Sequence, residues 1–261
     1  MKDLIRLLIP NERIKDVKKN KLKLSRDESH YLNRVMRVKI GQELFIVNGE
    51  GYLWRAIKRE KEFIEFVSLD KPDLVQNRKK ILLGLAISTP KSGFEDILKM
   101  STEIGIDFIQ PIYTEHQVKK LSNKINKYVR WNSIIKESVE QCERLWSPKI
   151  LDGINLYEWI NSVISKDIIS ISVTRNENTT SLKKWLNSQI FLNEKKYIVW
   201  NVIGPEGGWS KKELNFFKES QIQFVKLSEN ILKTPTAAIC TSSIFNQWRN
   251  DAINLCNSFE E

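Results

Sequence analysis

The sequence predicts an α/β protein in which a small N-terminal β-barrel precedes a larger α/β domain with a mainly parallel sheet. Up to about residue 70, apolar and polar residues alternate as they do in β-strands. From Ile81 onward, short apolar runs alternate instead with amphipathic helical stretches. The positive charge is concentrated in the first of these two parts. Residues 1–80 carry 20 Lys and Arg and 12 Asp and Glu, a net charge of +8, whereas the whole chain has a net charge of +10.

Four β-rich runs form the predicted barrel, at residues 4–9, 42–47, 52–57 and 62–69. The segment NGEG at 48–51 supplies the positive-φ positions that a tight hairpin needs between the second and third runs. Residues 27–38 have apolar side chains at 31, 32, 35 and 36, a spacing that predicts one helix. The polar stretch 71–80, with one proline, is the predicted linker.

The second domain is predicted to contain strands at 81–88, 108–113, 168–173, 197–203 and 224–227. Helices are predicted between and after them at 92–104, 122–145, 211–220 and 235–256. Apolar strands that alternate with helices favour a parallel sheet covered on both faces.

Composition excludes several classes of protein. Apolar residues make up 41% of the 261 residues, and charged residues 28%, ordinary values for a globular protein. No apolar run approaches the roughly 20 residues that span a bilayer, and the N-terminus lacks a signal-peptide pattern, so we expect a cytoplasmic protein with no membrane segment. Three cysteines without a C-x-x-C pair and only two histidines argue against a disulfide framework and against a metal site.

The basic excess of the first segment is the distribution expected of a surface that binds phosphates. A solvated basic surface that only aids solubility explains the charge equally well.

The most informative motif is IGPEGGWS at 203–210, which follows the apolar run YIVWNVI and precedes a helix. Ser210 and Glu213 form an S-x-x-E capping box at the start of that helix. A glycine-rich loop at the carboxyl end of a strand is where open α/β sheets bind ligands. The motif is neither G-x-G-x-x-G nor a P-loop, and a purely structural turn is the alternative.

Two further segments are candidates for function. In LSENILKTPTAA at 227–238, Thr234 and Pro235 have the pattern of an N-cap and first helical residue, before small residues that allow close packing on a cofactor or on the core. Glu137, Glu140 and Arg144 are spaced to share one face of the helix predicted at 122–145. The alternative for Glu140 and Arg144 is an ordinary surface ion pair.

In this order the motifs resemble those of the SPOUT methyltransferases. The matching segments are KSGFE and TEIG within 91–105, EQCER at 140–144, GPEGG at 204–208 and LSENILKTPTA at 227–237. The segment HYLNRVMRVKIGQ at 30–42 is similar to the PUA-like RNA-binding domain of one branch, the ribosomal RNA small subunit methyltransferase E family. That family methylates the N3 atom of a uracil in 16S ribosomal RNA.

The resemblance implies a PUA-like β-barrel at 1–72 and a SPOUT domain at 73–261, with a deep trefoil knot in about 197–245. It implies a homodimer that acts on 16S ribosomal RNA or on the assembled small ribosomal subunit. It also implies that S-adenosyl-L-methionine is the cofactor and is held by three loops. The residues implied are Val173, Thr174, Ile203, Gly204, Pro205, Glu206, Gly207, Gly208, Leu227, Ile231, Leu232, Thr236 and Ala237.

Removal of the N3 proton of uracil calls for a base or for stabilising cations. We assign Glu140 or Glu206 to assist proton removal, and Arg144 to contact RNA at the reacting centre. The residues predicted to bind RNA elsewhere are Arg26, Arg34, Arg37 and Lys91.

The chain departs from the family pattern at Lys233 and Pro235, where the family has Arg and Glu. The alternatives are a non-catalytic RNA-binding or ribosome-assembly protein with the same fold, and a SPOUT methyltransferase acting on another RNA.

Overall fold

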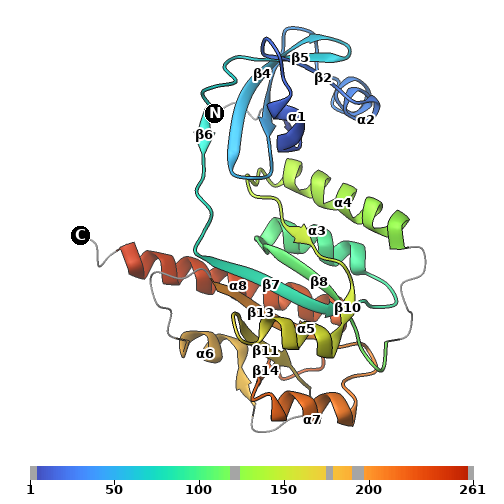
Figure 1. Cartoon of the computed structure of the whole chain (residues 1–261), viewed down its shortest axis with the longest axis vertical. Coiled ribbons are helices and arrows are strands. Elements are labelled where there is room, and N and C mark those ends of the chain that lie inside the picture. The colour runs from blue at the N-terminus through green and yellow to red at the C-terminus, as the bar shows by residue number, and fades with distance from the viewer. Residues whose placement is uncertain (1–4, 118–123, 175–178, 190–196, 258–261) are drawn as a thin grey trace. The chain divides into compact units, whose positions relative to one another are not determined.

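The computed structural model describes residues 5–117, 124–174, 179–189 and 197–257 (Figure 1). They form two compact units. The first consists of residues 1–78 together with Lys136–Ser147, and the second of 79–135 together with 148–261. The segment Lys136–Ser147 therefore belongs to the N-terminal unit. The domain bounds expected from the sequence, 1–72 and 73–261, place this segment in the second domain instead.

The first unit is built on a six-stranded sheet in the order β1-β3-β4-β5-β2, with β6 paired to β4. Its strands are β1 (Arg6–Leu8), β2 (Lys21–Lys23), β3 (Glu43–Val47), β4 (Tyr52–Glu60), β5 (Phe63–Phe66) and β6 (Leu74–Val75). The hairpin predicted at 48–51 is confirmed, since β3 and β4 are antiparallel and Gly49 and Gly51 have φ of 72° and 94°. Two short strands were not predicted: β2, and β6 inside the expected linker.

The single helix predicted at 27–38 is wrong in its form. A short α-helix, α2 (Arg26–His30), passes into a π-helical turn, η1 (Tyr31–Val35), and Arg37 then adopts a left-handed φ of 53°. The helix begins with a capping box in which Ser25 and Glu28 bond each other's backbone amides. A second helix, α1 (Asn11–Lys15), was not predicted.

The second unit contains an eight-stranded sheet in the order β10-β8-β7-β13-β11-β14-β12, with β9 paired to β8. The strands are β7 (Ile81–Ser88), β8 (Phe108–Tyr113), β9 (Lys149–Ile150), β10 (Ile154–Asn155), β11 (Ile168–Ser172), β12 (Thr180–Ser181), β13 (Tyr197–Ile203) and β14 (Gln223–Lys226). Its described strand pairs are all parallel, as predicted. At its centre, β13 pairs β7 from Tyr197↔Ile81 to Ile203↔Ile87. The carboxyl ends of the central strands therefore lie at one edge, where α/β sheets bind ligands.

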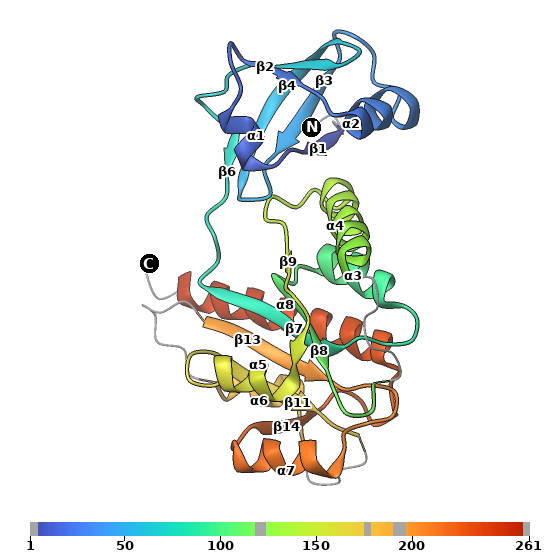
Figure 2. The ribbon, with the colours of Figure 1, turned by 45° about the vertical axis from the view of Figure 1, so that its right-hand side comes forward.

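Helices cover both faces of this sheet (Figure 2). On one face, α5 (Leu156–Val163) and α7 (Lys211–Glu219) contribute Trp159, Ile160 and Phe217 to a core shared with Trp200. On the other, α3 (Phe94–Ile104) packs against α8 (Thr234–Asn257), which also contacts α6 (Leu182–Asn187). The helices α5 and α6 were not predicted because each is at most eight residues long, too short to establish a helical period.

The helix α4 runs from Lys124 to Gln141, and the rest of its predicted range differs at both ends. Residues 122 and 123 lie outside the described part of the chain. At the other end, Glu143 has a left-handed φ of 62°, so the helix stops before Arg144. The prediction that Arg144 shares a helical face with Glu137 and Glu140 is therefore wrong.

Candidate functional site

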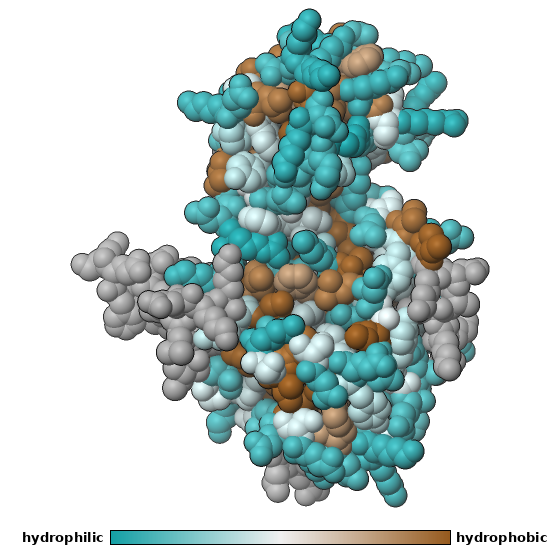
Figure 3. Space-filling view, viewed as in Figure 1, coloured by the Kyte–Doolittle hydropathy of each residue, from teal (hydrophilic) through white to brown (hydrophobic). Residues whose placement is uncertain are grey.

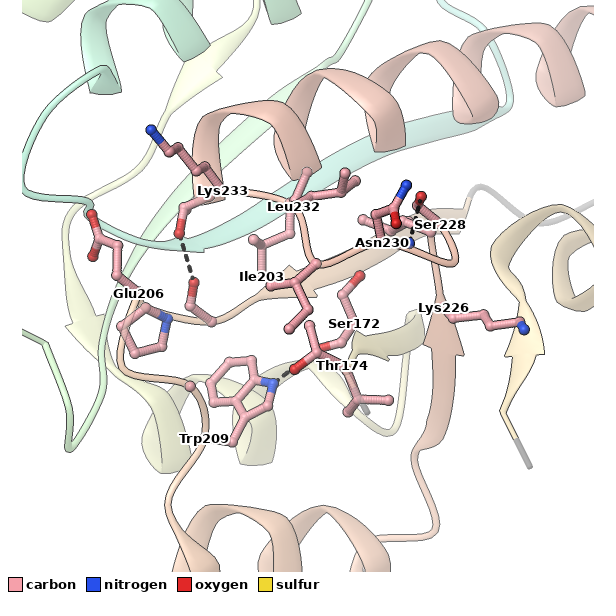
Figure 4. Close-up of a pocket in the computed structure, with 18 of the residues that line it drawn as sticks. Ser172, Thr174, Ile203, Glu206, Trp209, Lys226, Ser228, Asn230, Leu232 and Lys233 are labelled. Atoms are coloured by element: carbon pink, nitrogen blue, oxygen red, sulfur yellow. Dashed lines mark hydrogen bonds between the residues drawn. The ribbon is translucent and has the colours of Figure 1, made fainter. Parts of the chain in front are cut away.

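A cavity of about 860 Å³ opens at the carboxyl edge of the sheet in the second unit (Figure 4). Three chain segments line it, each starting at the last residue of a strand: 172–174 at the end of β11, 203–209 except 207 at the end of β13, and 226–234 at the end of β14. Leu214 and Ala237 complete the lining. All three segments thus follow neighbouring strands of the parallel sheet.

Most of the residues predicted for the cofactor loops line this cavity. They are Val173, Thr174, Ile203, Gly204, Pro205, Glu206, Gly208, Leu227, Ile231, Leu232 and Ala237. Gly207 and Thr236 are not among the lining residues. A Cβ on Gly207 would lie 3.1 Å from the Cβ of His116, so this glycine faces the segment after β8. Thr236 is exposed on the first turn of α8.

The glycine-rich loop is shaped by Trp209. A Cβ on Gly204 would lie 2.9 Å from Cε2 of the Trp209 indole, so the ring occupies the space that a larger side chain would need. The indole Nε1 donates a hydrogen bond of 2.9 Å to the carbonyl oxygen of Ser172. This bond joins the loop after β13 to the segment after β11 (Figure 4).

The positive φ of Gly208, 73°, completes the turn before α7. The predicted capping box is confirmed, since Ser210 Oγ accepts from Glu213 N at 3.0 Å and Glu213 Oε2 accepts from Ser210 N at 2.8 Å. The ring nitrogen Nδ1 of His116 lies 3.0 Å from the carbonyl oxygen of Gly208 and holds the loop from the outside.

Thr234 joins the third loop to the second. Its hydroxyl donates a 3.2 Å hydrogen bond to the carbonyl oxygen of Gly204. The predicted N-cap role of Thr234 is wrong, because the carbonyl oxygen of Lys233 already accepts from Ala237 N at 2.9 Å and the helix begins one residue earlier. The cavity wall is therefore held by bonds between its loops.

Several lining residues were missed from the sequence. They are Ser172, Trp209, Leu214, Lys226, Ser228, Glu229, Asn230, Lys233 and Thr234. Trp209 belongs to the motif IGPEGGWS, and residues 228–230 lie between the predicted positions 227 and 231. These residues could have been predicted by taking each loop as a continuous segment. The amine ends of Lys226 and Lys233 point away from the centre of the cavity in Figure 4, and Lys226 pairs with Glu229 at 2.8 Å.

Glu206 lies at the cavity and Lys91 beside it. One oxygen of the Glu206 carboxylate, Oε1, accepts a 3.0 Å hydrogen bond from the backbone N–H of Lys91. Both side chains are exposed. The structure thus brings together one predicted catalytic carboxylate and one predicted RNA-binding lysine.

Glu140 and Arg144 belong to the first unit. Glu140 is buried, with 7% of its surface exposed, and its Oε1 accepts a 2.8 Å hydrogen bond from the backbone N–H of Leu8. Burial raises the pKa of Glu140 to about 7, while the Leu8 amide and the nearby Lys136 act in the opposite direction. The alternative of an ordinary surface residue is therefore excluded for Glu140.

The predicted RNA-binding arginines of the first unit are all exposed. Arg26 begins α2, and Arg34 and Arg37 flank the exposed apolar side chains of Val35 and Met36. Ile40, which is 70% exposed, follows them. On the face shown in Figure 3, hydrophilic side chains of the first unit surround smaller apolar groups.

Buried Lys58 anchors the segment after η1. Its amine donates to the carbonyl oxygen of Val38 at 2.6 Å and to Oδ1 of Asn33 at 2.5 Å. Burial lowers the pKa of Lys58. The exposed residues between Asn33 and Val38 are therefore presented by a segment that is fixed at both ends.

Among the described residues, no three His, Cys, Asp or Glu side chains are grouped so that they could hold a metal ion. In the same part of the chain, no helix has the length and apolar character needed to cross a membrane.

Comparison with known proteins assigns a family. The sequence pattern of an RNA methyltransferase domain matches residues 76–246, and that of an RNA methyltransferase PUA domain matches 24–57. The ribosomal RNA small subunit methyltransferase E of Synechocystis is 32% identical over 220 residues, which are 82% of this chain and 69% of that protein. The protein of the same name from Mesomycoplasma hyopneumoniae is 30% identical over 80% of this chain and 87% of its own length.

A crystal structure supports the likeness of fold. It is that of a ribosomal RNA small subunit methyltransferase E from Neisseria gonorrhoeae bound to S-adenosyl methionine. The TM-score is 0.76 at 22% identity, with 94% of this chain and 97% of that one covered. With a family pattern over most of the chain and two relatives at 30% identity or more, the chain belongs to the ribosomal RNA small subunit methyltransferase E family of RNA methyltransferases.

Proposed function

We propose that this protein transfers a methyl group from S-adenosyl-L-methionine to the N3 atom of a uracil in 16S ribosomal RNA. The observation that carries the proposal is the cavity of about 860 Å³ formed by three loops at the strand ends, in a chain of this family. Relatives that bear the name of this activity support the substrate, and the relative bound to S-adenosyl methionine supports the cofactor.

The residues of the cavity fit the proposed cofactor. The volume of the cavity lies within the range of about 300–1,000 Å³ that is typical of small-molecule sites. Ile203, Leu214 and Leu232 offer apolar surface for a flat base, while the hydroxyl of Ser172 and the loop backbones offer polar groups for a ribose and an amino acid. We expect the three loops to hold the cofactor mainly through the backbone, because the absence of a Cβ on Gly204 lets the chain approach closely.

When bound, S-adenosylmethionine supplies a methyl group on a sulfonium that is already activated for transfer. The protein must then align the uracil and accept its N3 proton. We assign to Glu206 the role of accepting the N3 proton. Its Oε1 accepts a hydrogen bond from the backbone N–H of Lys91, and its side chain is exposed at the cavity. Glu140 is the second candidate, since a pKa of about 7 suits a general base at neutral pH.

We infer that the first unit contributes the RNA contacts. Arg26, Arg34 and Arg37 are exposed cations suited to phosphates, and we assign Arg144 to the same role near the reacting base. Unstacked bases of single-stranded RNA stack on guanidinium planes, so Arg34 and Arg37 suit such contacts, and the exposed Val35 and Met36 between them add apolar surface. Double-helical RNA offers no such base surface in its deep, narrow groove.

Three implied properties stay predictions. They are the homodimer, the knot in about 197–245, and the assembled small ribosomal subunit as the form in which the RNA is bound. An enzyme that modifies ribosomal RNA would work in the cytoplasm, where that RNA is assembled. Sedimentation of the purified protein tests the dimer.

The function is tested by incubating the protein with S-adenosylmethionine and small ribosomal subunits from cells that lack the gene. Mass spectrometry of the digested RNA should find one new N3-methyluridine. Methyl transfer to transfer RNA alone, or cofactor binding with no methylated RNA, would overturn the assignment. Glu206→Gln and Glu140→Gln test the carboxylates, and full turnover in both variants would remove the role of either as base.

A further inference from the structure

A buried polar cluster lies beneath the cavity. Its centre is Asn201 of β13, which has no exposed surface. The Asn201 side chain lies within hydrogen-bond distance of three hydroxyls: Ser172 Oγ at 2.7 Å, Ser170 Oγ at 2.9 Å and Thr241 Oγ1 at 3.3 Å. Ser170 and Thr241 are also fully buried, whereas Ser172 reaches the cavity lining. We call these four residues the Asn201 cluster.

The Asn201 cluster joins three elements that each border one of the cavity loops: β11, β13 and α8. Ser170 and Ser172 belong to β11, which leads into the loop at 173–174. Asn201 belongs to β13, which leads into the glycine-rich loop, and Thr241 lies in α8, directly after the third loop. The bonds from Trp209 to Ser172 and from Thr234 to Gly204 link the same loops at the level of the cavity itself.

Stability alone gives no reason for an amide at this position. If this amide and its partner hydroxyls were all replaced by apolar side chains of the same shape, the stability could be nearly unchanged or higher. A connected polar cluster does specify one arrangement of the elements it joins, because each member loses its partner when an element shifts. At this place in the fold, the arrangement that it specifies is that of the three loops.

We infer that Asn201 is a positioning residue for the methyl-donor site, acting through Ser172 and Thr241. It is not among the residues that line the cavity, so its effect reaches the ligand only through the groups that it holds. The inference rests on the proposed function, since it takes the cavity as the site of S-adenosylmethionine. The inference predicts that cofactor affinity depends on the hydroxyl of Thr241 in α8, although Thr241 is not among the residues that line the cavity.

The test removes that hydroxyl with Thr241→Val, which keeps the shape of the side chain. Calorimetric titration with S-adenosylhomocysteine should show about fivefold weaker binding, the loss expected of one neutral hydrogen bond. In turnover assays the KM for S-adenosylmethionine should rise with kcat little changed. Thr241→Ser, which restores a hydroxyl, should bind within about twofold of the wild type. Ser170→Ala repeats the test from β11, at a buried hydroxyl that accepts from Asn201 Nδ2 at 2.9 Å and does not line the cavity.

The matched control is Ser242→Ala, at the next residue of α8. Ser242 is equally buried, but its hydroxyl lies 3.1 Å from Ser101 of α3, away from the Asn201 cluster. This variant should lose thermal stability and keep the affinity of the wild type. Wild-type affinity in Thr241→Val and Ser170→Ala would overturn the inference, as would an equal loss in Ser242→Ala. A wild-type protein that fails to bind S-adenosylhomocysteine would instead overturn the proposed function.

Discussion

Replacement of Glu140 by Gln should change how the stability of the protein depends on pH. In the folded protein, burial raises the pKa of Glu140 to about 7, against 4.5 for the unfolded chain. Lys136 lowers it, whereas Glu137 and Glu28 raise it. Since the folded state binds this proton more tightly, its contribution to stability is greatest below pH 4.5 and is lost as the pH rises through 7.

The size of the effect follows from the shift. At about 1.4 kcal/mol per pKa unit, the carboxyl should cost the wild type about 2–3 kcal/mol of unfolding free energy between about pH 5 and pH 8. Glu140→Gln retains an oxygen for the Leu8 amide, which the wild-type carboxylate binds at 2.8 Å, and cannot ionise. The variant should therefore gain that amount relative to the wild type over the same interval.

Urea unfolding at both pH values measures the difference, with Glu60→Gln as control. Glu60 forms a solvent-exposed pair with Lys21 in the same unit, and an exposed pair contributes less than about 1 kcal/mol. If the stabilities of wild type and Glu140→Gln changed in parallel with pH, Glu140 would not be a buried carboxyl with a raised pKa.

Three other substitutions test other parts of the molecule. Gly204→Ala should weaken S-adenosylhomocysteine binding by about tenfold, because the new Cβ would meet the Trp209 indole at 2.9 Å; unchanged affinity in a titration would show that the loop is free to move. Asp107→Ala should lower the unfolding free energy by about 3–5 kcal/mol, because the buried Arg249 guanidinium loses the carboxylate that lies 2.5 Å from it in the wild type. A melting temperature within a degree or two of the wild type would contradict this. Arg37→Asn, which tolerates the left-handed φ of 53°, should reduce the slope of log affinity against log salt for RNA by about 1; the same slope would mean that Arg37 meets no phosphate.

The sheet and the main cavity loops were predictable because their signals are local. The strands β7, β8 and β13 have the predicted bounds, since each is a short apolar run between polar segments. The loop after β13 was identified from its glycines and its capping box. Loops that follow neighbouring parallel strands meet at one edge, so the cavity could be expected once the strands were known.

Contacts between distant segments were not predictable. The bond between Leu8 and Glu140 joins residues 132 positions apart, and no spacing along the chain announces it. The Asn201 cluster was not predictable, because a single asparagine within the apolar run YIVWNVI is still consistent with a buried strand. Lys58 of β4 donates to Asn33 in η1 and to Val38 after it, contacts over 25 and 20 residues that the spacing of apolar residues in 27–38 does not predict.

In the proposed function, the cavity at the carboxyl edge of the sheet holds the methyl donor. A crystal structure of the protein grown with S-adenosylhomocysteine tests it most directly. We predict that the ligand lies between the segments 172–174, 203–209 and 226–234, against Gly204 and Ser172. A ligand bound outside this cavity, or a cavity closed by movement of Trp209 into it, would contradict the account.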